Sequence, residues 1–270
     1  MAMAVVEGTT NLDPSLGRLF AVVGVFDGLH RGHEYLLAEL RRVAAERDAR
    51  PAVITFDHHP DEILKGKAPP LLCDPSERLD RLRAAGIAIT VIETFDRELR
   101  ETTYDEWIRR IAERVELVGF LMTPESAFGY ERGGTPETVA ALGRTLGYEV
   151  VVVPQFTLDG APIRSSDIRA AIAAGDLALA ERLLGRRVGI VGTVARALRA
   201  ATELGFGLPV ALPPAGRYEA FVRTLGGGVR SRDVDVDDGR VAIVPALPVR
   251  TGERLALELV RSRSGNIRRS

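Results

Sequence analysis

The chain has 270 residues, enough for one large α/β domain or for two domains of ordinary size. Apolar residues make up 46% and charged residues 27%, the balance of a globular protein, and no run approaches the roughly 18 to 20 apolar residues of a membrane helix. A formal net charge of −1 gives no global support for binding nucleic acid, and the single cysteine, Cys73, excludes an internal disulfide and a thiolate metal cluster. The first 13 residues lack the pattern of a secretory signal, so we expect a cytoplasmic protein with neither membrane nor nucleic-acid partners.

Apolar runs alternate with amphipathic stretches through the first part of the chain. Strands are predicted over 19–25, 52–56, 87–92, 115–122 and 149–153, and helices over 32–45, 75–85, 104–114 and 136–146. Asp74 and Thr135 are the expected N-caps of the second and fourth helices, which Gly86 and Gly147 end. The alternation predicts an α/β fold, a Rossmann-like parallel sheet with helices on both faces.

The texture changes around Gly185. Two short helices, 167–173 and 177–184, are followed by strand-like runs punctuated by Gly and Pro, at 188–195, 217–224, 241–245 and 254–260. This pattern predicts a small β-barrel-like domain. We therefore place a first domain at 1–185 and a second at 186–270.

The sharpest motif is residues 24–33, GVFDGLHRGH, between the first strand and the first helix. Ligands bind at the carboxyl edge of open α/β sheets, and the first-turn amides of a helix favour an anion there. Gly28 and Gly32 allow close approach of the backbone to a phosphate. His30 and His33 can both donate hydrogen bonds to it and stabilise charge that builds during displacement. A zinc site using His58 or His59 as well would need a third ligand and an open position, and the glycines favour the anion site.

A second candidate is the segment 165–169, SSDIR. Ser165 or Ser166 is predicted to cap the helix that begins there, leaving amides for phosphate. Arg169, one turn later, is placed to form a fork to a phosphate. The alternative reading is a plain cap with a solvated arginine.

These motifs together resemble the bacterial bifunctional riboflavin kinase/FMN adenylyltransferases, the FAD synthetases, within the HIGH-type nucleotidyltransferases. GVFDGLHRGH is similar to their (G)xFDGxHxGH signature, and residues 55–60, TFDHHP, to their TFxPHP segment. AFG at 127–129, then Gly133 and Gly134, is similar to their FRFG…G loop. SSDIR, then Gly175-Asp176 and LLGR at 183–186, is similar to their SSTxIR…GD…LLGRP block. The resemblance covers about residues 17 to 195.

The resemblance implies in-line attack by the phosphate of FMN on the α-phosphate of ATP, with Mg²⁺ on the leaving oxygens and no nucleophilic side chain. The catalytic residues implied are His30, His33 and Arg169. The residues implied to bind ATP are Gly24, Phe26, Asp27, Gly28, His30, Gly32, His33, Ser165, Ser166 and Arg169. Those implied to bind the acceptor are His59, Glu125, Phe128 and Gly129. Asp27 is expected to hold loop amides rather than metal, and the Mg²⁺ ligands and the oligomeric state stay open.

Several positions depart from the family pattern. Val25 replaces an Asn, His58 replaces the proline of TFxPHP, and the loop 124–129, PESAFG, lacks an aromatic and an arginine. The GxVxxGxxxGRxLGFPTAN stretch of the kinase barrel is represented only by Gly192-Thr193-Val194 and residues 203–209, ELGFGLP, so we expect a remnant barrel without riboflavin kinase activity. FAD formation from FMN is the leading reading. Transfer to another phosphorylated acceptor, as in the pantetheine-phosphate or nicotinamide-mononucleotide relatives, and a non-catalytic nucleotide or flavin sensor are the alternatives.

Overall fold

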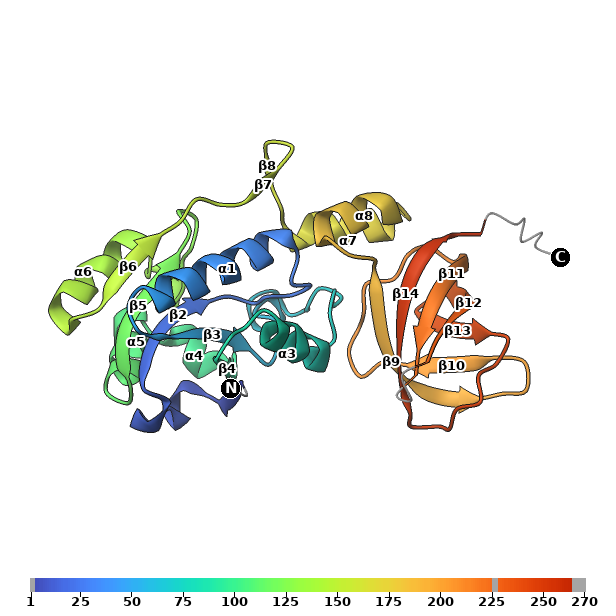
Figure 1. The fold of residues 1–270 in the computed structure, drawn as a ribbon, viewed down its shortest axis with the longest axis horizontal. Helices are drawn as coiled ribbons and strands as arrows, with labels where there is room; N and C mark the ends of the chain where they lie inside the picture. Colours follow the sequence, from blue (N-terminus) through green and yellow to red (C-terminus); the bar gives the residue numbers. More distant parts are fainter. Residues whose placement is uncertain (1–2, 225–227, 264–270) are drawn as a thin grey trace. The chain divides into compact units, whose positions relative to one another are not determined.

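The computed structural model describes residues 3–224 and 228–263 (Figure 1). The chain divides into two compact units that interleave along the sequence. Unit 1 comprises the residues up to Phe26, then Gly32–Pro69 and Arg78–Pro162. Unit 2 comprises Asp27–Arg31, Pro70–Glu77 and the residues from Ile163 onwards. The functional boundary at 185/186 stays a prediction.

A six-stranded parallel sheet forms the centre of unit 1, in the order β1-β4-β3-β2-β5-β6. Its strands are β1 (Ala4–Glu7), β2 (Arg18–Val23), β3 (Arg50–Phe56), β4 (Ile89–Glu93), β5 (Glu116–Met122) and β6 (Glu149–Val152). Residues 19–22 of β2 are buried in succession, so both faces of this central strand are covered, as predicted.

Helices connect the strands along the first 162 residues (Figure 1). They are α1 (Arg31–Ala45), α2 (Asp61–Lys65), α3 (Pro75–Ala84), α4 (Arg97–Glu101), α5 (Tyr104–Ala112) and α6 (Pro136–Leu146). The strand order steps one way from β2 to β4 and the other way from β4 to β6. Since crossovers between parallel strands are right-handed, α1 and α3 belong to one face and α5 and α6 to the other. The order reverses beside β2, which places the expected ligand crevice at the carboxyl end of that strand.

The predicted caps explain where two of these helices begin and end. Asp74 accepts a hydrogen bond from the Ser76 amide at 2.9 Å at the start of α3. Thr135 and Thr138 form a reciprocal capping box at the start of α6, which ends at Gly147 in the left-handed conformation. The helices α2 and α4 were not predicted, because five residues are too few to show a helical period.

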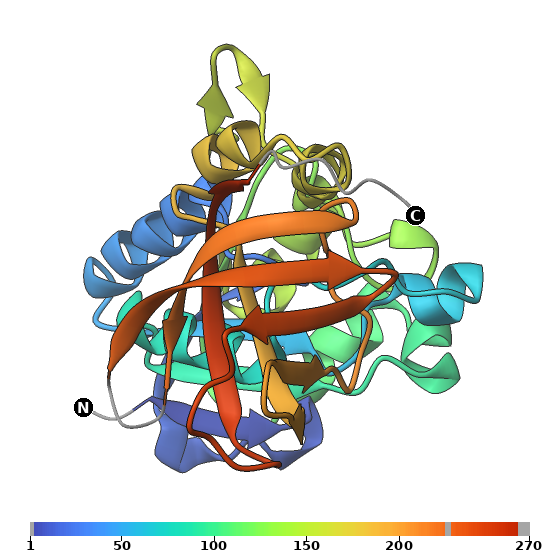
Figure 2. The ribbon, with the colours of Figure 1, turned by 90° about the vertical axis from the view of Figure 1, so that its right-hand side faces the viewer.

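Unit 2 contains α7 (Ser165–Ala173), α8 (Leu177–Leu184) and a closed six-stranded antiparallel barrel in the order β10-β13-β12-β11-β14-β9 (Figure 2). The barrel strands are β9 (Gly189–Ala197), β10 (Thr202–Gly205), β11 (Gly216–Arg223), β12 (Val229–Asp237), β13 (Arg240–Val244) and β14 (Arg254–Ser262). The predicted small barrel is therefore confirmed, and despite its short length it closes. Aliphatic side chains such as Val222, Val234 and Ile243 are buried within it.

The remaining strands, β7 (Thr157–Leu158) and β8 (Ala161–Pro162), form a two-stranded hairpin in unit 1. Among the described residues, none of the helices combines the length and apolar character needed to cross a membrane.

Candidate functional site

The loop between β2 and α1 has an unusual backbone. Phe26, Gly28 and Leu29 have positive φ angles of 51°, 82° and 39°. Left-handed conformations are costly for Phe and Leu, and they persist only where the surroundings fix them. Both side chains are almost fully buried, at 1% and 2% exposure, which supplies that constraint. The loop carrying the motif is therefore held in one strained shape, as is common at binding sites.

Gly28 and the two motif residues in α1 are placed by local sterics. A Cβ on Gly28 would lie 3.0 Å from the Leu72 side chain, in addition to its positive φ, so only glycine fits. Gly32 and His33 lie in the first turn of α1. The His33 ring packs on Phe26, with ring centroids 5.1 Å apart. The motif is divided between the two units. Unit 1 contains Gly24, Phe26, Gly32 and His33, and the motif residues between Phe26 and Gly32 belong to unit 2.

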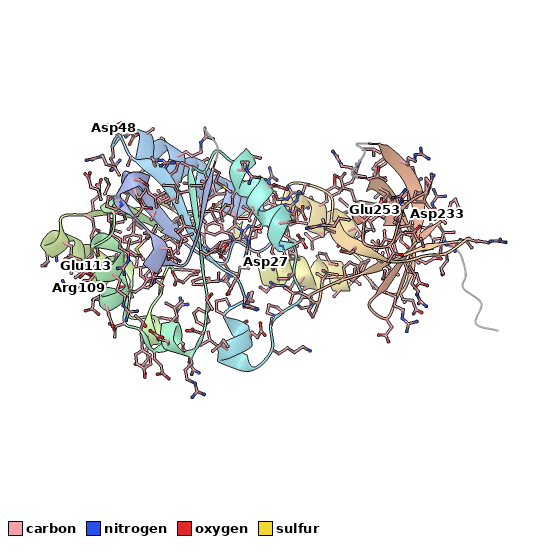
Figure 3. All side chains as sticks on the ribbon, turned by 90° about the horizontal axis from the view of Figure 1, so that it is seen from below. Asp27, Asp48, Arg109, Glu113, Asp233 and Glu253 are labelled. Atoms are coloured by element: carbon pink, nitrogen blue, oxygen red, sulfur yellow. The ribbon has the colours of Figure 1, made fainter. Side chains whose placement is uncertain are left out.

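Asp27, labelled in Figure 3, makes polar contacts with several other residues of unit 2. Its carboxylate is 4% exposed and accepts from the Leu72 amide at 3.0 and 3.3 Å. It also pairs with the Arg169 guanidinium at 2.5 Å, while Arg169 Nε donates to the Pro70 carbonyl at 2.8 Å. The carboxylate holds a loop amide, as expected, and in addition an arginine that the sequence had assigned to phosphate.

The capping role expected of Ser165 or Ser166 is wrong. Helix α7 begins at Ser165, its N-cap is Arg164, and no side chain caps it. The Ser165 hydroxyl donates instead to the Asp27 carbonyl at 3.1 Å, and the Ser166 hydroxyl to Asp167 at 3.3 Å. Ser165 therefore connects α7 to the motif loop. Asp27 therefore contacts Ser165 through its backbone carbonyl and Arg169 through its carboxylate.

His30 is buried at 5% exposure, and its environment disfavours the charged form. Burial, and secondarily the positive charge of Arg186, lower the pKa of His30 to about 4. Arg186 also donates to the carbonyls of Gly28 at 2.6 Å and Leu29 at 3.2 Å. The sequence did not predict these contacts of Arg186, although this residue ends the LLGR segment on which part of the resemblance rests.

A cavity of about 710 Å³ opens at the carboxyl edge of the sheet in unit 1. Its wall includes all four residues expected to bind the acceptor, namely His59, Glu125, Phe128 and Gly129. It also includes Gly24, the first residue of the motif. The cavity and the motif therefore meet at the carboxyl end of β2.

Aromatic contacts shape the wall of this cavity. Phe128 packs against Trp107 and Phe120, with ring centroids 5.4 and 6.0 Å away, and Phe56 meets Phe95 edge-on at 5.4 Å. Trp107 was not predicted as a site residue, because it falls on the apolar face of α5 and is read there as core.

Gly129 and His59 have defined local roles. Gly129 has φ +76°, and a Cβ there would lie 2.6 Å from the Tyr104 amide nitrogen. His59 Nδ1 accepts from the Asp61 amide at 3.2 Å. Glycine at 129 lets the loop pass α5 closely, and the bond to Asp61 orients the imidazole at the end of β3.

The buried Arg78, which the sequence also did not predict as a site residue, binds the backbone just after β2 and at the end of β3 in unit 1. Arg78 donates to the carbonyls of Val25 at 3.2 Å and Phe56 at 2.8 Å. The Thr55 hydroxyl donates to the same Val25 carbonyl at 3.0 Å. Both carbonyls belong to residues of the cavity wall, so these bonds set its position relative to the sheet.

The residues do not form a ready metal site. Within 3–224 and 228–263, no group of three or more His, Cys, Asp or Glu side chains is arranged to hold a metal ion. Asp27, the carboxylate of the motif, is already engaged by Leu72 and Arg169. A protein cage for Mg²⁺ or Zn²⁺ therefore does not fit the described residues.

A model of the FAD synthetase family matches residues 13–167, more than half of the chain. The chain belongs to the FAD synthetase family. It is 31% identical over 204 residues to the bifunctional riboflavin kinase/FMN adenylyltransferase of Pseudomonas fluorescens, an alignment covering 75% of this chain and 66% of that protein. The protein of that name from Escherichia coli K12 is 31% identical over 225 residues, covering 82% of this chain and 71% of its own length.

The fold extends beyond the family match. A solved structure titled as a macrolide-efflux protein from Streptococcus pneumoniae superposes with a TM-score of 0.80, at 20% identity, over 98% of this chain and 93% of its own. That likeness concerns the fold alone. Membership of the family makes the chain a nucleotidyltransferase. The aligned part spans about two thirds of the length of the relatives it matches.

Proposed function

We propose that this chain transfers the adenylyl group of ATP to FMN and releases FAD and pyrophosphate. The observation that carries the proposal is the cavity of unit 1. It has an aromatic wall suited to a planar ring system, lies at the sheet edge where ligands bind, and begins at Gly24 of the nucleotide motif. FMN has the planar ring system for that wall and a terminal phosphate to act as nucleophile.

In the proposed reaction, a phosphate oxygen of FMN attacks the α-phosphorus of ATP in line with the bond to the β-phosphate. A P–O bond forms, the bond from the α-phosphorus to the bridging oxygen breaks, and pyrophosphate leaves with the electron pair. No covalent enzyme intermediate is needed. His30 and His33 donate to the α-phosphate oxygens as negative charge builds there. Ser165, Ser166 and Arg169 bind the leaving phosphates. Mg²⁺ accompanying ATP would neutralise charge on the leaving oxygens, and the described residues offer it no cage of protein side chains.

Arg169 begins this sequence paired with Asp27. To reach phosphate it exchanges one carboxylate partner for another anion, and the contact from Nε to the Pro70 carbonyl keeps its stem in place. Asp27 then retains the Leu72 amide. This exchange makes Asp27 a positioning residue and Arg169 a phosphate ligand.

We further propose that the barrel of unit 2 has no riboflavin kinase activity. The stretch 203–209 lacks the Thr and Asn of the family's PTAN segment, and the barrel interior is filled by aliphatic side chains. The proposed reaction draws on ATP and FMN, small molecules of the cytoplasm, which is the location we propose for the protein.

The test is incubation of the purified chain with Mg-ATP and either FMN or riboflavin, followed by chromatographic separation of the flavins. FAD from FMN but not from riboflavin, lost in His30→Ala, supports both proposals. FMN formed from riboflavin overturns the inactive kinase. No product from FMN overturns the acceptor assignment, and a panel of other phosphorylated acceptors would then separate another nucleotidyltransferase from a sensor that binds ATP without turnover.

A further inference from the structure

Trp107 is the sole tryptophan of the chain and lies on α5 in the wall of the cavity. Its side chain is 95% buried, since the residue is only 5% exposed. Within the part of the chain that the structure describes, its indole Nε1 has no hydrogen-bond partner. A strong donor is therefore held out of water at the wall of the proposed acceptor site.

The hydroxyl groups of two buried tyrosines, by contrast, have partners. The Tyr148 hydroxyl donates to the Val139 carbonyl at 2.8 Å, and the Tyr218 hydroxyl to the Pro214 carbonyl at 2.7 Å. Buried polar groups in native structures are nearly always paired, and an exception calls for an explanation. The apolar surroundings of the indole would accept phenylalanine without that loss, so packing alone does not account for tryptophan at this position.

We propose that Trp107 is a specificity-determining residue whose indole N–H donates a hydrogen bond to the ring system of the acceptor. The inference rests on the proposed function, because it takes the cavity as the acceptor site. The acceptor must then be planar enough to lie against the aromatic wall and must carry a carbonyl oxygen or a bare ring nitrogen on its edge. The isoalloxazine ring of FMN has both, whereas an acyclic acceptor with a terminal phosphate offers no such flat edge.

Phe128 lies beside the donor. Its ring packs edge-on against Trp107, with an interplanar angle of 66°. It belongs to the segment between β5 and α6, where only Phe128 and Gly134 form an isolated bridge. In the proposed contact the edge of the acceptor ring enters beside Phe128 and accepts from the indole N–H, since both residues line the cavity.

Because the chain has one tryptophan, the indole can be replaced selectively by its benzothiophene isostere, which keeps the shape and exchanges N–H for sulfur. We would compare this protein with the parent and with Trp107→Phe, measuring FMN affinity, steady-state kinetics, and the ultraviolet resonance Raman band that reports indole hydrogen bonding. Loss of one neutral hydrogen bond should weaken FMN binding roughly 3- to 10-fold in both variants. The kcat should change less than about twofold, because the contact is made equally in the ground and transition states.

A shift of the Raman band in the parent on addition of FMN, together with the raised KM, supports the proposal. Unchanged FMN affinity in the benzothiophene protein, or an unshifted band in saturated parent, overturns it while leaving FAD synthesis standing. If the parent binds FMN with the Raman shift but makes no FAD, the adenylyl transfer fails and the indole contact holds. Absence of any FMN binding overturns both.

Discussion

The imidazole of His30 is uncharged near neutral pH, because burial and Arg186 lower its pKa to about 4 from an ordinary value of 6.5. A neutral imidazole keeps one N–H group, which can donate to a phosphate oxygen. An anion beside it offsets the charge of Arg186, so bound ATP should raise the pKa of His30. The protonation of His30 should therefore depend on whether ATP is bound.

The depressed pKa of His30 makes stability depend on pH. Between pH 6.5 and about 4 the unfolded chain binds more protons at this residue than the folded chain, so stability falls as the pH falls through that window. From pH 7 to pH 4.5 the parent should lose roughly 2 kcal/mol more unfolding free energy than His30→Gln, which does not titrate. Urea unfolding at the two pH values measures this difference, and equal losses in the two proteins would refute the assignment.

Asp27 and Arg169 form a largely buried ion pair. Removing one charge leaves the other without its partner, so Asp27→Asn should lower the unfolding free energy by roughly 3 kcal/mol. It should also weaken ATP binding, because Arg169 loses its alignment. The matched control is Asp235→Asn, which breaks an exposed pair with Arg217 on the barrel and should cost less than about 1 kcal/mol. Similar losses for the two variants, measured in urea, would contradict a structural role for Asp27.

The residues of the site were predictable where backbone geometry or charge marked them. Gly28 and Gly129 have positive φ angles and lie close to another chain segment. A glycine within a motif is a signal of such a position that the sequence itself provides. Arg186 and Trp107 were not found because their roles depend on contacts across long sequence separations. Arg186 reaches carbonyls more than 150 residues earlier, and Trp107 reads as core on an apolar helix face.

Among the elements, α6 has the best-defined start. Its capping box satisfies amides at the first turn, and Thr135→Ala removes the side chain that accepts from Thr138. We expect a loss of about 1 kcal/mol in unfolding free energy. Thr145→Ala, on an exposed position of the same helix, removes a threonine without a cap and should change stability by less than about 0.5 kcal/mol. Thermal and urea unfolding of the pair measure the difference.

Elements with a strong period or a cap were predicted nearly to their ends, as α6 and α8 show. The strand β12, VRSRDVDVD, was missed because charged side chains dominate it. Charged side chains on β12 pair with side chains outside the strand, as Asp235 does with Arg217 on the adjacent β11, so the strand is stabilised by partners that the local sequence does not contain. The short β1 and β10 carry too few residues for an alternation to be seen.

At the scale of the whole molecule, unit 2 depends on a segment taken from the middle of the unit 1 sequence. Leu71 exchanges two backbone hydrogen bonds with residues 209 and 211, each 2.8 Å long, and Asp74 pairs with Arg254 of the barrel at 2.7 Å. The next residue, Leu72, gives its amide to Asp27. One short segment therefore joins the barrel to the proposed phosphate site within the same unit.

Leu71→Pro tests this connection, because it removes an amide donor without adding charge. We expect a loss of roughly 1 to 3 kcal/mol in stability, and weaker ATP binding through the displaced Leu72 amide. Leu71→Ala keeps the amide and serves as control for the lost side chain. Isothermal titration with ATP and urea unfolding distinguish the two variants. Equal ATP affinity in both would show that the backbone bonds of Leu71 do not affect nucleotide binding.

The interleaving of the two units limits how such a chain can be shortened in evolution. A domain attached by a single linker can be discarded in one genetic event once its reaction is no longer needed. Here the chain around 209–211 and Arg254 of the barrel hold Leu71 and Asp74, beside the Leu72 amide that donates to Asp27, so deletion of the barrel would remove these partners. Substitutions that erase a chemical activity from the barrel are tolerated far more easily than its loss, and a catalytically silent barrel can persist as an obligatory scaffold for the transferase.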